Sequence, residues 1–373
     1  MTARRAPWLG GAIPRFPGIL VSLFVASAAL GQTEAPIAHE IPPPFGDRSL
    51  FILHLPILDF APARPQAPGA GRFDWELSSA YANTFSTTEA VNYLHNLLQR
   101  RGQPLDSTEV AELHDDFPNQ ALLFVDGEVI RTALRARYGL TSRLFVAVEV
   151  PYIDRSATAD GTVRKFHRQI GQSENGRDLF PSGGLAVLIQ SAGGSTTFFG
   201  GPRKSGIGDV SFSLGWRPPA TTWGLAYGAD VTVKTPTGSS ADLNGSGGWD
   251  AGFLLFVVWR KGLWTLEADG SFVDPGTWTA PLRLEPDAFT RALISVMRDF
   301  GTRTRVGASV TVGQSPFHDR RFSSLSRAGV ELALGFEYDV LPGIPARLTL
   351  NENIPTFGDR ADFAVGLSLR YRR

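Results

Sequence analysis

The chain has 373 residues, and its 36 lysines and arginines balance 36 aspartates and glutamates. Forty glycines and 11% aromatic residues suit strands and tight turns, and no cysteine occurs. The balanced charge offers no basic patch to a nucleic-acid partner, and the lack of thiols excludes disulfides and cysteine-based catalytic or metal sites. The length allows one large all-β domain or two ordinary domains.

The first 31 residues have the pattern of a secretory signal peptide. Three arginines precede an apolar run at 18–30, and small residues lead up to Gly31. The run is shorter than the ~20 apolar residues that a membrane helix needs. Charge, apolar run and small residues in this order are typical of a cleaved leader, so we predict that residues 1–31 are removed on export.

Residues 32–71 form a proline-rich segment with one short apolar stretch, Leu50–Leu58. Two interpretations stay open. The segment is either a disordered periplasmic tail or a plug that tucks its apolar side chains into or under a barrel. The side chains in question are Phe51, Leu53, Leu55 and Ile57.

The remaining residues, 72–373, alternate between apolar and polar positions. In 327–340 one parity is apolar from Ala328 to Val340, and the other is small or charged. Alternate residues of a strand point to opposite faces. The strands run about ten to thirteen residues, longer than soluble strands and close to the ~9–11 residues that cross a bilayer. The pattern therefore predicts a closed antiparallel transmembrane β-barrel, all-β in class.

Aromatic residues and loop lengths support the same fold. The aromatics at the ends of the apolar stripes resemble interfacial girdles, and short and long connections alternate as in outer-membrane barrels. Because every backbone group in lipid must be paired, the sheet has to close. The aromatics are Trp75, Tyr138, Trp216, Trp223, Trp259, Trp264, Tyr338 and Tyr371.

We expect twelve strands in the barrel wall. Two pieces of about six residues, 185–190 and 195–200, are too short to span and are interpreted as a hairpin in the second long loop; fourteen strands is the alternative. The predicted strands are 72–84, 120–139, 143–153, 207–217, 223–235, 249–260, 263–273, 287–300, 303–313, 327–340, 345–353 and 361–372.

The two longest extracellular loops carry signals for short helices. In the first, 88–98 has apolar residues at helical spacing, and Asp106 with Glu109 fits a capping box. In the second, Phe166, His167 and Ile170 share one helix face. We interpret these three residues as a candidate lid over the barrel mouth.

Several short motifs are spread over most of the mature chain. The most distinctive is the Phe166-His167 loop with Gly176-Arg177. The other motifs are Asp126-Gly127-Glu128, Arg137-Tyr138-Gly139-Leu140, Pro151-Tyr152-Ile153, Gly206-Ile207-Gly208-Asp209 and Lys234-Thr235-Pro236-Thr237-Gly238. Together they resemble a domain-of-unknown-function family of bacterial proteins with a predicted outer-membrane barrel. The resemblance implies a barrel and an outer-membrane location, and it brings no activity.

No catalytic or cofactor motif is found. The six histidines have no metal-ligand spacing, and neither a Gly-x-Ser-x-Gly elbow nor a phosphate loop occurs. We therefore predict no enzymatic activity, no cofactor and no metal.

The inward parity of the strands supplies the candidate lumen-lining residues. Pairing Tyr138 with Leu144 across the first short turn places Arg135 diagonal to Glu149, close enough for long side chains to meet. The signs are mixed, which favours a structural ion-pair network or a polar conduit with weak ion preference. The candidates are Arg131, Arg135, Glu149, Asp209, Asp230, Glu267, Glu331, Glu337 and Arg370.

These observations predict a narrow outer-membrane pore for small polar solutes. A plugged structural or interaction barrel is the alternative, and a lipid-modifying barrel enzyme is a third. The expected partners are outer-membrane lipid and the barrel-assembly machinery, with no nucleic acid.

Overall fold

The computed structural model describes residues 41, 43–88, 119, 121–155, 165, 169, 185–190, 196–201, 204–282, 284–317, 322–341, 344–353 and 361–372. They belong to one unit, Glu40–Arg373. Within these ranges, no helix has the length and apolar character to cross a membrane. The predicted signal peptide, the expected helices of the first long loop and the lid residues Phe166, His167 and Ile170 lie outside the described residues.

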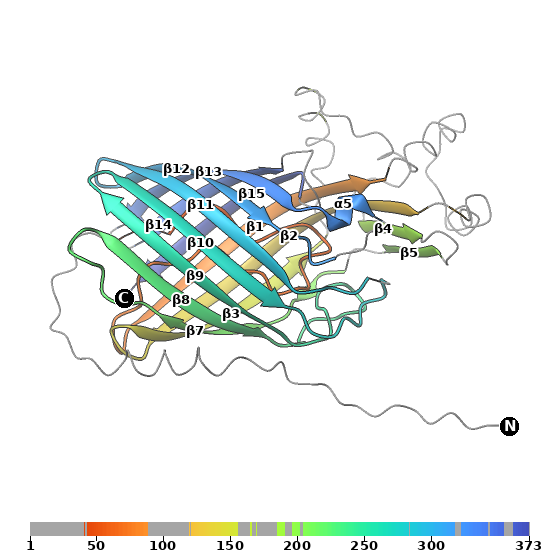
Figure 1. Cartoon of the computed structure of the whole chain (residues 1–373), viewed down its shortest axis with the longest axis horizontal. Helices are drawn as coiled ribbons and strands as arrows, with labels where there is room; N and C mark the ends of the chain where they lie inside the picture. Colours follow the sequence, from red (N-terminus) through yellow and green to blue (C-terminus); the bar gives the residue numbers. More distant parts are fainter. Residues whose placement is uncertain are drawn as a thin grey trace. The chain divides into compact units, whose positions relative to one another are not determined.

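The described residues form one antiparallel sheet (Figure 1). A four-residue helix, α5 (Ser323–Ser326), lies in the connection between the strands that end at Gly313 and begin at Gly329. The strands are β1 (Phe73–Thr87), β2 (Leu122–Gly139), β3 (Leu144–Asp154), β4 (Leu185–Gln190), β5 (Thr196–Gly201), β6 (Gly206–Ile207), β7 (Ser211–Trp216), β8 (Leu225–Lys234), β9 (Asp250–Lys261), β10 (Trp264–Asp274), β11 (Phe289–Phe300), β12 (Thr304–Gly313), β13 (Gly329–Leu341), β14 (Ile344–Asn353) and β15 (Phe363–Arg372).

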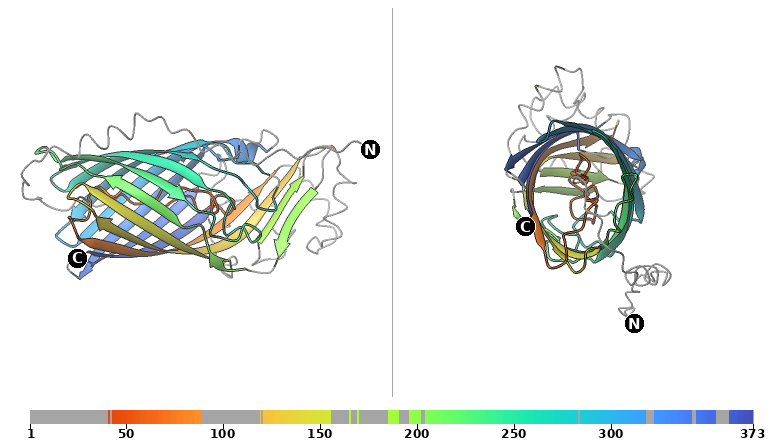
Figure 2. Two further views of the ribbon diagram at one scale, coloured as in Figure 1. Left: turned by 90° about the horizontal axis from the view of Figure 1, so that it is seen from below. Right: turned by 90° about the vertical axis from the view of Figure 1, so that its left-hand side faces the viewer.

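Twelve of these strands close into a ring. Strand β2 pairs with both β1 and β3, strand β1 also pairs with β15, and β7 to β15 follow in order. Figure 2 shows the ring end-on. The predicted all-β barrel of twelve strands is therefore confirmed, with short turns at one end and long loops at the other.

The hairpin of β4 and β5 extends the sheet outside the ring. Among the described ring strands, β4 pairs with β2 alone, over residues 122–126 at the long-loop end. The twelve-strand interpretation therefore holds. The predicted strand 207–217 divides into β6 and β7. Its register against β3 shifts by one residue between the Tyr152–Ile207 and Glu149–Ser211 pairs, across Pro151, which has no N–H for the ladder.

One predicted register is wrong. Tyr138 pairs with Val146 rather than Leu144, and Arg135 lies directly opposite Glu149 instead of diagonal to it. The turn is centred one residue later because the hydroxyl of Thr141 accepts the N–H groups of Arg143 and Leu144.

The two faces of the wall differ as the alternation predicts. On β13, Leu332, Leu334 and Phe336 are 39%, 52% and 45% exposed on the outer face, whereas Ala333 and Glu337 are buried. The predicted girdle aromatics lie near the short-turn end, where Trp75 pairs with Tyr371 and both rings are in contact. The outer surface is thus an apolar belt with an aromatic rim.

Candidate functional site

Residues 43–71, the interior segment, lie inside the ring (Figure 2). The segment begins near the short turns, where Arg347 of β14 donates to Pro44 O at 2.7 Å. It reaches the long-loop end at 50–58 and returns to the short-turn end, where Gly71 N donates to Gly139 O at 2.8 Å. The segment is therefore U-shaped, and the ends of both its arms lie near the short turns.

The apex of the interior segment is an apolar plug at the long-loop end. Phe51, Ile52 and Leu53 are fully buried, and they belong to a cluster that includes Phe317 and Phe322 from the loop after β12. The apex thus closes the barrel beneath the long loops. Of the two interpretations that the sequence left open for residues 32–71, these contacts favour the plug.

The two arms are joined below the apex by polar contacts. Ser49 N donates to Asp59 Oδ2 at 2.6 Å, and the Ser49 hydroxyl lies 2.9 Å from His54 Nδ1. Leu58 N donates to Asp250 Oδ2 of β9 at 2.8 Å. Buried polar groups need such partners, so these bonds fix the turn.

Arginines of the wall hold the arms. Arg217 at the end of β7 donates to both carboxylate oxygens of Asp230, at 2.8 and 2.9 Å, and its Nε donates to Arg64 O at 2.6 Å. Arg137 of β2 binds Asp74 in the same way and donates to Gln66 O at 3.0 Å. In both cases a wall carboxylate orients the guanidinium, and the remaining N–H groups bind the segment.

The same arrangement recurs on the other side of the ring. Arg347 pairs with Glu337 at 2.6 Å and donates to the carbonyl oxygens of Pro43 and Pro44. Arg291 of β11 pairs with Asp59 at 2.8 Å and donates to the carbonyls of Phe60, at 3.1 Å, and Asp47. Arg291 thus ties both arms to one strand.

This arrangement explains the preference for arginine, since only four lysines occur in the whole chain. A segment without regular secondary structure presents carbonyl groups that need donors. A guanidinium has five N–H groups in a fixed plane, whereas an ammonium is a compact point charge. Arginine can therefore bind a carboxylate and a carbonyl at once.

The wall also makes room for the segment. A Cβ atom at Gly335 of β13 would lie 1.8 Å from Phe45 Cδ1, so only glycine allows this close approach. The guanidinium of Arg347 stacks over the same ring at 4.7 Å. Phe45 is fully buried as a result.

The nine candidate lumen residues all lie on the inner parity, and they do not form a single cluster. Seven are buried, and Arg135 and Glu331 are half-buried. Arg131 pairs with Glu149 at 2.6 Å, and Arg305 and Arg347 share Glu337. Asp230 and Asp209 serve separate partners, Arg217 and Lys234.

Lys234 and Arg155 hold the loop between β8 and β9 at the long-loop end, and the candidate residues did not include them. Lys234 contacts Asp209, Asp250 at 3.2 Å and the Ser246 hydroxyl at 2.7 Å. Arg155 donates to Asp242 O, Leu243 O and Asn244 Oδ1 at 2.6–2.7 Å. No periodicity signals such a loop anchor.

The pKa values in this loop follow from its contacts. Burial lowers the pKa of Arg155 to about 10, against the opposing effect of Asp242. The hydrogen bond from Lys204 and that from the Ser239 hydroxyl lower the pKa of the Asp242 carboxyl. Asp242 therefore stays ionised at neutral pH and keeps its ion pair with Lys204, 2.8 Å away.

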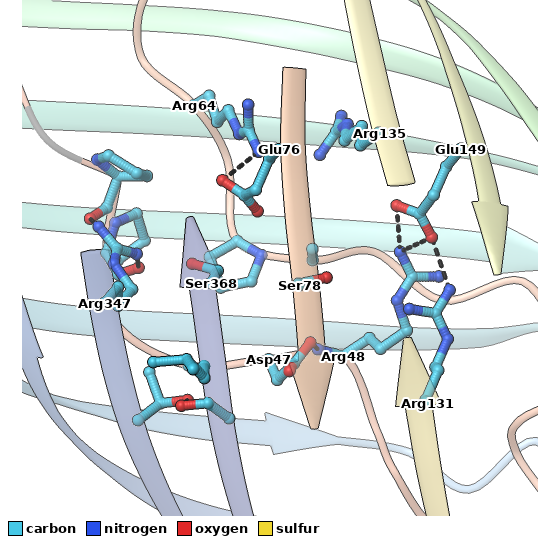
Figure 3. Close-up of a pocket in the computed structure, with 18 residues that line it drawn as sticks. Asp47, Arg48, Arg64, Glu76, Ser78, Arg131, Arg135, Glu149, Arg347 and Ser368 are labelled. Atoms are coloured by element: carbon cyan, nitrogen blue, oxygen red, sulfur yellow. Dashed lines mark hydrogen bonds and ion pairs between the residues drawn. The ribbon is translucent and has the colours of Figure 1, made fainter. Parts of the chain in front are cut away.

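A cavity of about 70 Å³ lies between the interior segment and the wall (Figure 3). The segment contributes residues 43–48 and 61–64, and strands β1, β2, β3, β14 and β15 supply the rest. The charged lining residues are Asp47, Arg48, Arg64, Glu76, Arg131, Arg135, Glu149 and Arg347. The sequence indicated Arg131, Arg135 and Glu149 as lumen residues, but it did not indicate Arg347 of β14. It also missed Asp47, Arg48 and Arg64, because the segment that carries them has no periodicity.

Among the described residues, no group of three or more His, Cys, Asp or Glu side chains is placed to hold a metal ion. The lumen is instead organised by guanidinium groups that bind carboxylates and backbone carbonyls.

Comparison with known structures identifies the class of fold. The crystal structure of the COG4313 outer membrane channel from Pseudomonas putida F1 matches 84% of this chain and 100% of its own chain, with a TM-score of 0.51 and 12% identity. The P. putida toluene transporter TodX matches 82% and 90%, with a TM-score of 0.35 and 13% identity. The NanC porin matches 79% and 98%, with a TM-score of 0.38 and 7% identity. The first match shows that the fold is that of a solved outer-membrane channel.

A family described as "Protein of unknown function (DUF3187)" matches residues 109–264. The predicted resemblance to a domain-of-unknown-function family is thereby confirmed. No curated protein matches the sequence.

Proposed function

We propose that the protein is a bacterial outer-membrane channel for small polar solutes, held closed by its interior segment. The apolar outer face supports placement in lipid, and the aromatic rim at the short-turn end fits a membrane interface. In outer-membrane barrels the short turns face the periplasm. Both arms of the segment then open to the periplasm, and the apex blocks passage to the outside.

The observation that carries this proposal is how the segment is attached. Among the described residues of 43–68 other than His54, Asp59 and Gln66, none is joined to a strand by a backbone–backbone hydrogen bond. The polar contacts between the segment and the wall use side chains, chiefly arginines. Side-chain contacts exchange with water more easily than a strand ladder does, because such bonds contribute only ~1.5–3 kcal/mol each when one partner is charged.

The closed barrel leaves little free space. Side chains just fill an eight-stranded barrel, and a ring of twelve strands is wider. Here the added width is occupied by the segment, and the cavity beside it measures about 70 Å³. Transport in this proposal therefore requires the segment to move toward the periplasm.

A disulfide tether tests the proposal. A Cβ at position 335 would lie 1.9 Å from Phe45 Cγ, so cysteines at 45 and 335 would be near disulfide distance once the ring is removed. The chain has no native cysteine to interfere. We expect F45C/G335C to be silent in planar bilayers when oxidised and to conduct when reduced, at least as well as the wild type.

Single-cysteine variants F45C and G335C are the matched controls, and reductant should not change their current. A wild type and a reduced double variant that both lack current, with the barrel folded by gel mobility, would contradict the channel. A reduced variant and an oxidised variant with equal current would contradict gating by the segment.

The apolar apex favours a second candidate, a permanently plugged structural barrel. Burial of Phe51, Ile52 and Leu53 stabilises the plug by ~1.5–3 kcal/mol per side chain. This role would be supported by a folded barrel without current in any redox state. The lid suggested for Phe166, His167 and Ile170 remains a separate prediction: deletion of 157–180 should raise the conductance.

A further inference from the structure

We propose that the cavity between the interior segment and the wall binds one small oxyanion, a carboxylate or a phosphate, through Arg135. This inference rests on the closed state proposed above and deepens it by naming the class of solute that occupies the lumen.

The side chain of Arg135 points into the cavity (Figure 3). In the part of the chain that the structure describes, no hydrogen bond and no ion pair involves its side chain, although it is half-buried. Figure 3 shows Arg135 between the Arg64–Glu76 pair and Glu149, with no interaction drawn from it. An unpaired guanidinium in a partly buried site is costly unless an anion joins it.

The neighbouring carboxylates are already engaged. Glu76 pairs with Arg64 from the segment. Glu149 lies directly across the strand pair from Arg135, but its carboxylate binds Arg48 and Arg131, both at 2.6 Å.

The cavity as a whole carries excess positive charge. Five arginines and three carboxylates line it. The fifth arginine, Arg347, has its partner Glu337 outside the lining. One positive charge is left over, and it is the charge of Arg135.

Other donors lie around the cavity. Arg48 Nε and Arg64 Nη1 are buried without a hydrogen-bond partner, although Arg64 Nη1 lies 3.8 Å from Asp74 Oδ1. The Ser78 hydroxyl makes one long hydrogen bond, to Ala133 O at 3.5 Å, and Ser368 also lines the cavity. Guanidinium groups bind carboxylate and phosphate oxygens through paired N–H groups. The donor set therefore matches an oxyanion with two or more accepting oxygens.

The volume limits the size of the ligand. A water molecule needs roughly 10–15 Å³ of such space, so a cavity of about 70 Å³ has room for a ligand of on the order of five non-hydrogen atoms. Acetate and inorganic phosphate have this size. Averaged over the lumen, the mixed charges predict weak ion preference, but this one position has a net sign.

The test measures binding rather than current. The folded full-length protein in detergent is titrated with sodium acetate and, separately, with sodium phosphate, while sodium gluconate keeps the ionic strength constant. Gluconate is too large for the cavity. We expect a saturable rise in thermal-unfolding temperature with at least one of the two anions, and at least a tenfold weaker apparent affinity in R135Q.

Two further variants separate charge from folding. R135K keeps the charge but loses the planar donor fork, so we expect binding between those of the wild type and R135Q. R303Q removes an exposed arginine from a short turn and should bind like the wild type. If R135Q does not fold, R135K is compared with R303Q. A weaker anion affinity of R135K than of R303Q supports the site, and equal affinities contradict it.

Each outcome decides the proposal. Saturation with acetate alone identifies a carboxylate site, saturation with phosphate alone a phosphate site, and saturation with both a general oxyanion site. No saturable effect, or equal binding in wild type and all Arg135 variants, overturns it. The binding test does not depend on current. A barrel that binds acetate but does not conduct in planar bilayers would therefore contradict the proposed channel and support this site.

Discussion

The barrel wall and the interior segment lie in contact along the whole lumen, and they are stabilised in different ways. Each wall strand is bonded to two neighbours through its backbone, whereas the segment is bonded to the wall through side chains of individual arginines. Strand pairing is cooperative along the whole ladder. The arginine contacts can break one at a time, so we expect that the wall would stay intact if the segment moved.

The largest effect is expected when the Arg291–Asp59 ion pair, which joins the segment to the wall, is broken. Both side chains are about 6% exposed. R291A leaves a buried carboxylate without its cation, and loss of one partner of a buried pair costs about 3–5 kcal/mol. We expect this cost to fall on the segment, so that its open population rises by roughly a hundredfold or more.

Thiol labelling measures that population. Ala63 in the segment is buried. Because the chain has no native cysteine, A63C introduces the only thiol. R291A/A63C should react with a maleimide about a hundredfold faster than A63C alone, while both keep the gel mobility of a folded barrel; R303A/A63C is the matched control. Loss of the barrel itself in R291A would show that segment and wall are one cooperative unit.

The second prediction tests the wall alone. An arginine that faces lipid near the midplane costs about 2–4 kcal/mol, and Leu334 and Leu367 are 52% and 60% exposed on the outer face. L334R and L367R should therefore assemble poorly, as measured by the fraction of heat-modifiable barrel. E331R and S368R, on the inner parity, should assemble far better. Equal assembly of both groups would refute the assignment of faces.

The sequence predicts the wall better than the segment because the wall has a period. Alternation in 327–340 places Leu334 outside and Glu337 inside, and both positions agree with the structure. The same parity identifies Arg135 and Glu149 as inner residues. It does not identify how they pair, because the turn at Thr141 shifts the register of β2 against β3 by two residues from the predicted one.

The segment has no period from which its contacts could be predicted. Arg48, Arg64 and Asp59 meet the wall only because a chain without regular structure folds back on itself at 50–58. Arg48 pairs with Glu149, 101 positions away, and Asp59 pairs with Arg291, 232 positions away. Arg64 pairs with the nearer Glu76, but only because the segment ends where β1 enters the wall. Spacing in the sequence carries no signal for such pairs, although the scarcity of lysine hints at the arginine chemistry.

A milder change tests whether arginine is needed to hold the segment. R217K keeps the positive charge near Asp230 but loses the hydrogen bond that the Arg217 guanidinium donates to Arg64 O. It also loses the stacking of the guanidinium over Phe145 and Phe256, whose ring centres lie 5.0 and 4.5 Å from the guanidinium carbon. The loss of one charged hydrogen bond costs on the order of 1.5 kcal/mol. We expect labelling of R217K/A63C to be about tenfold faster than that of A63C. Unchanged labelling would mean that charge alone retains the segment.

The smallest expected effect concerns the loop at 235–249, which is anchored outside the spanning strands. The pKa of Asp242 is lowered from 3.8 by Lys204 and Ser239, so its contribution to stability is present above about pH 4 and is lost as the pH falls through its lower folded value. The gain is small, below about 1 kcal/mol, because Lys204 is 61% exposed and water screens the pair.

D242N should change the unfolding temperature only slightly at pH 7 and should flatten the fall in stability below pH 4. Its matched control, D274N, removes the same charge from the end of β10. An acid profile identical in D242N and wild type would place the origin of that fall in the buried lumen pairs instead, and would make the segment rather than the loop the first part of the molecule to respond to acid.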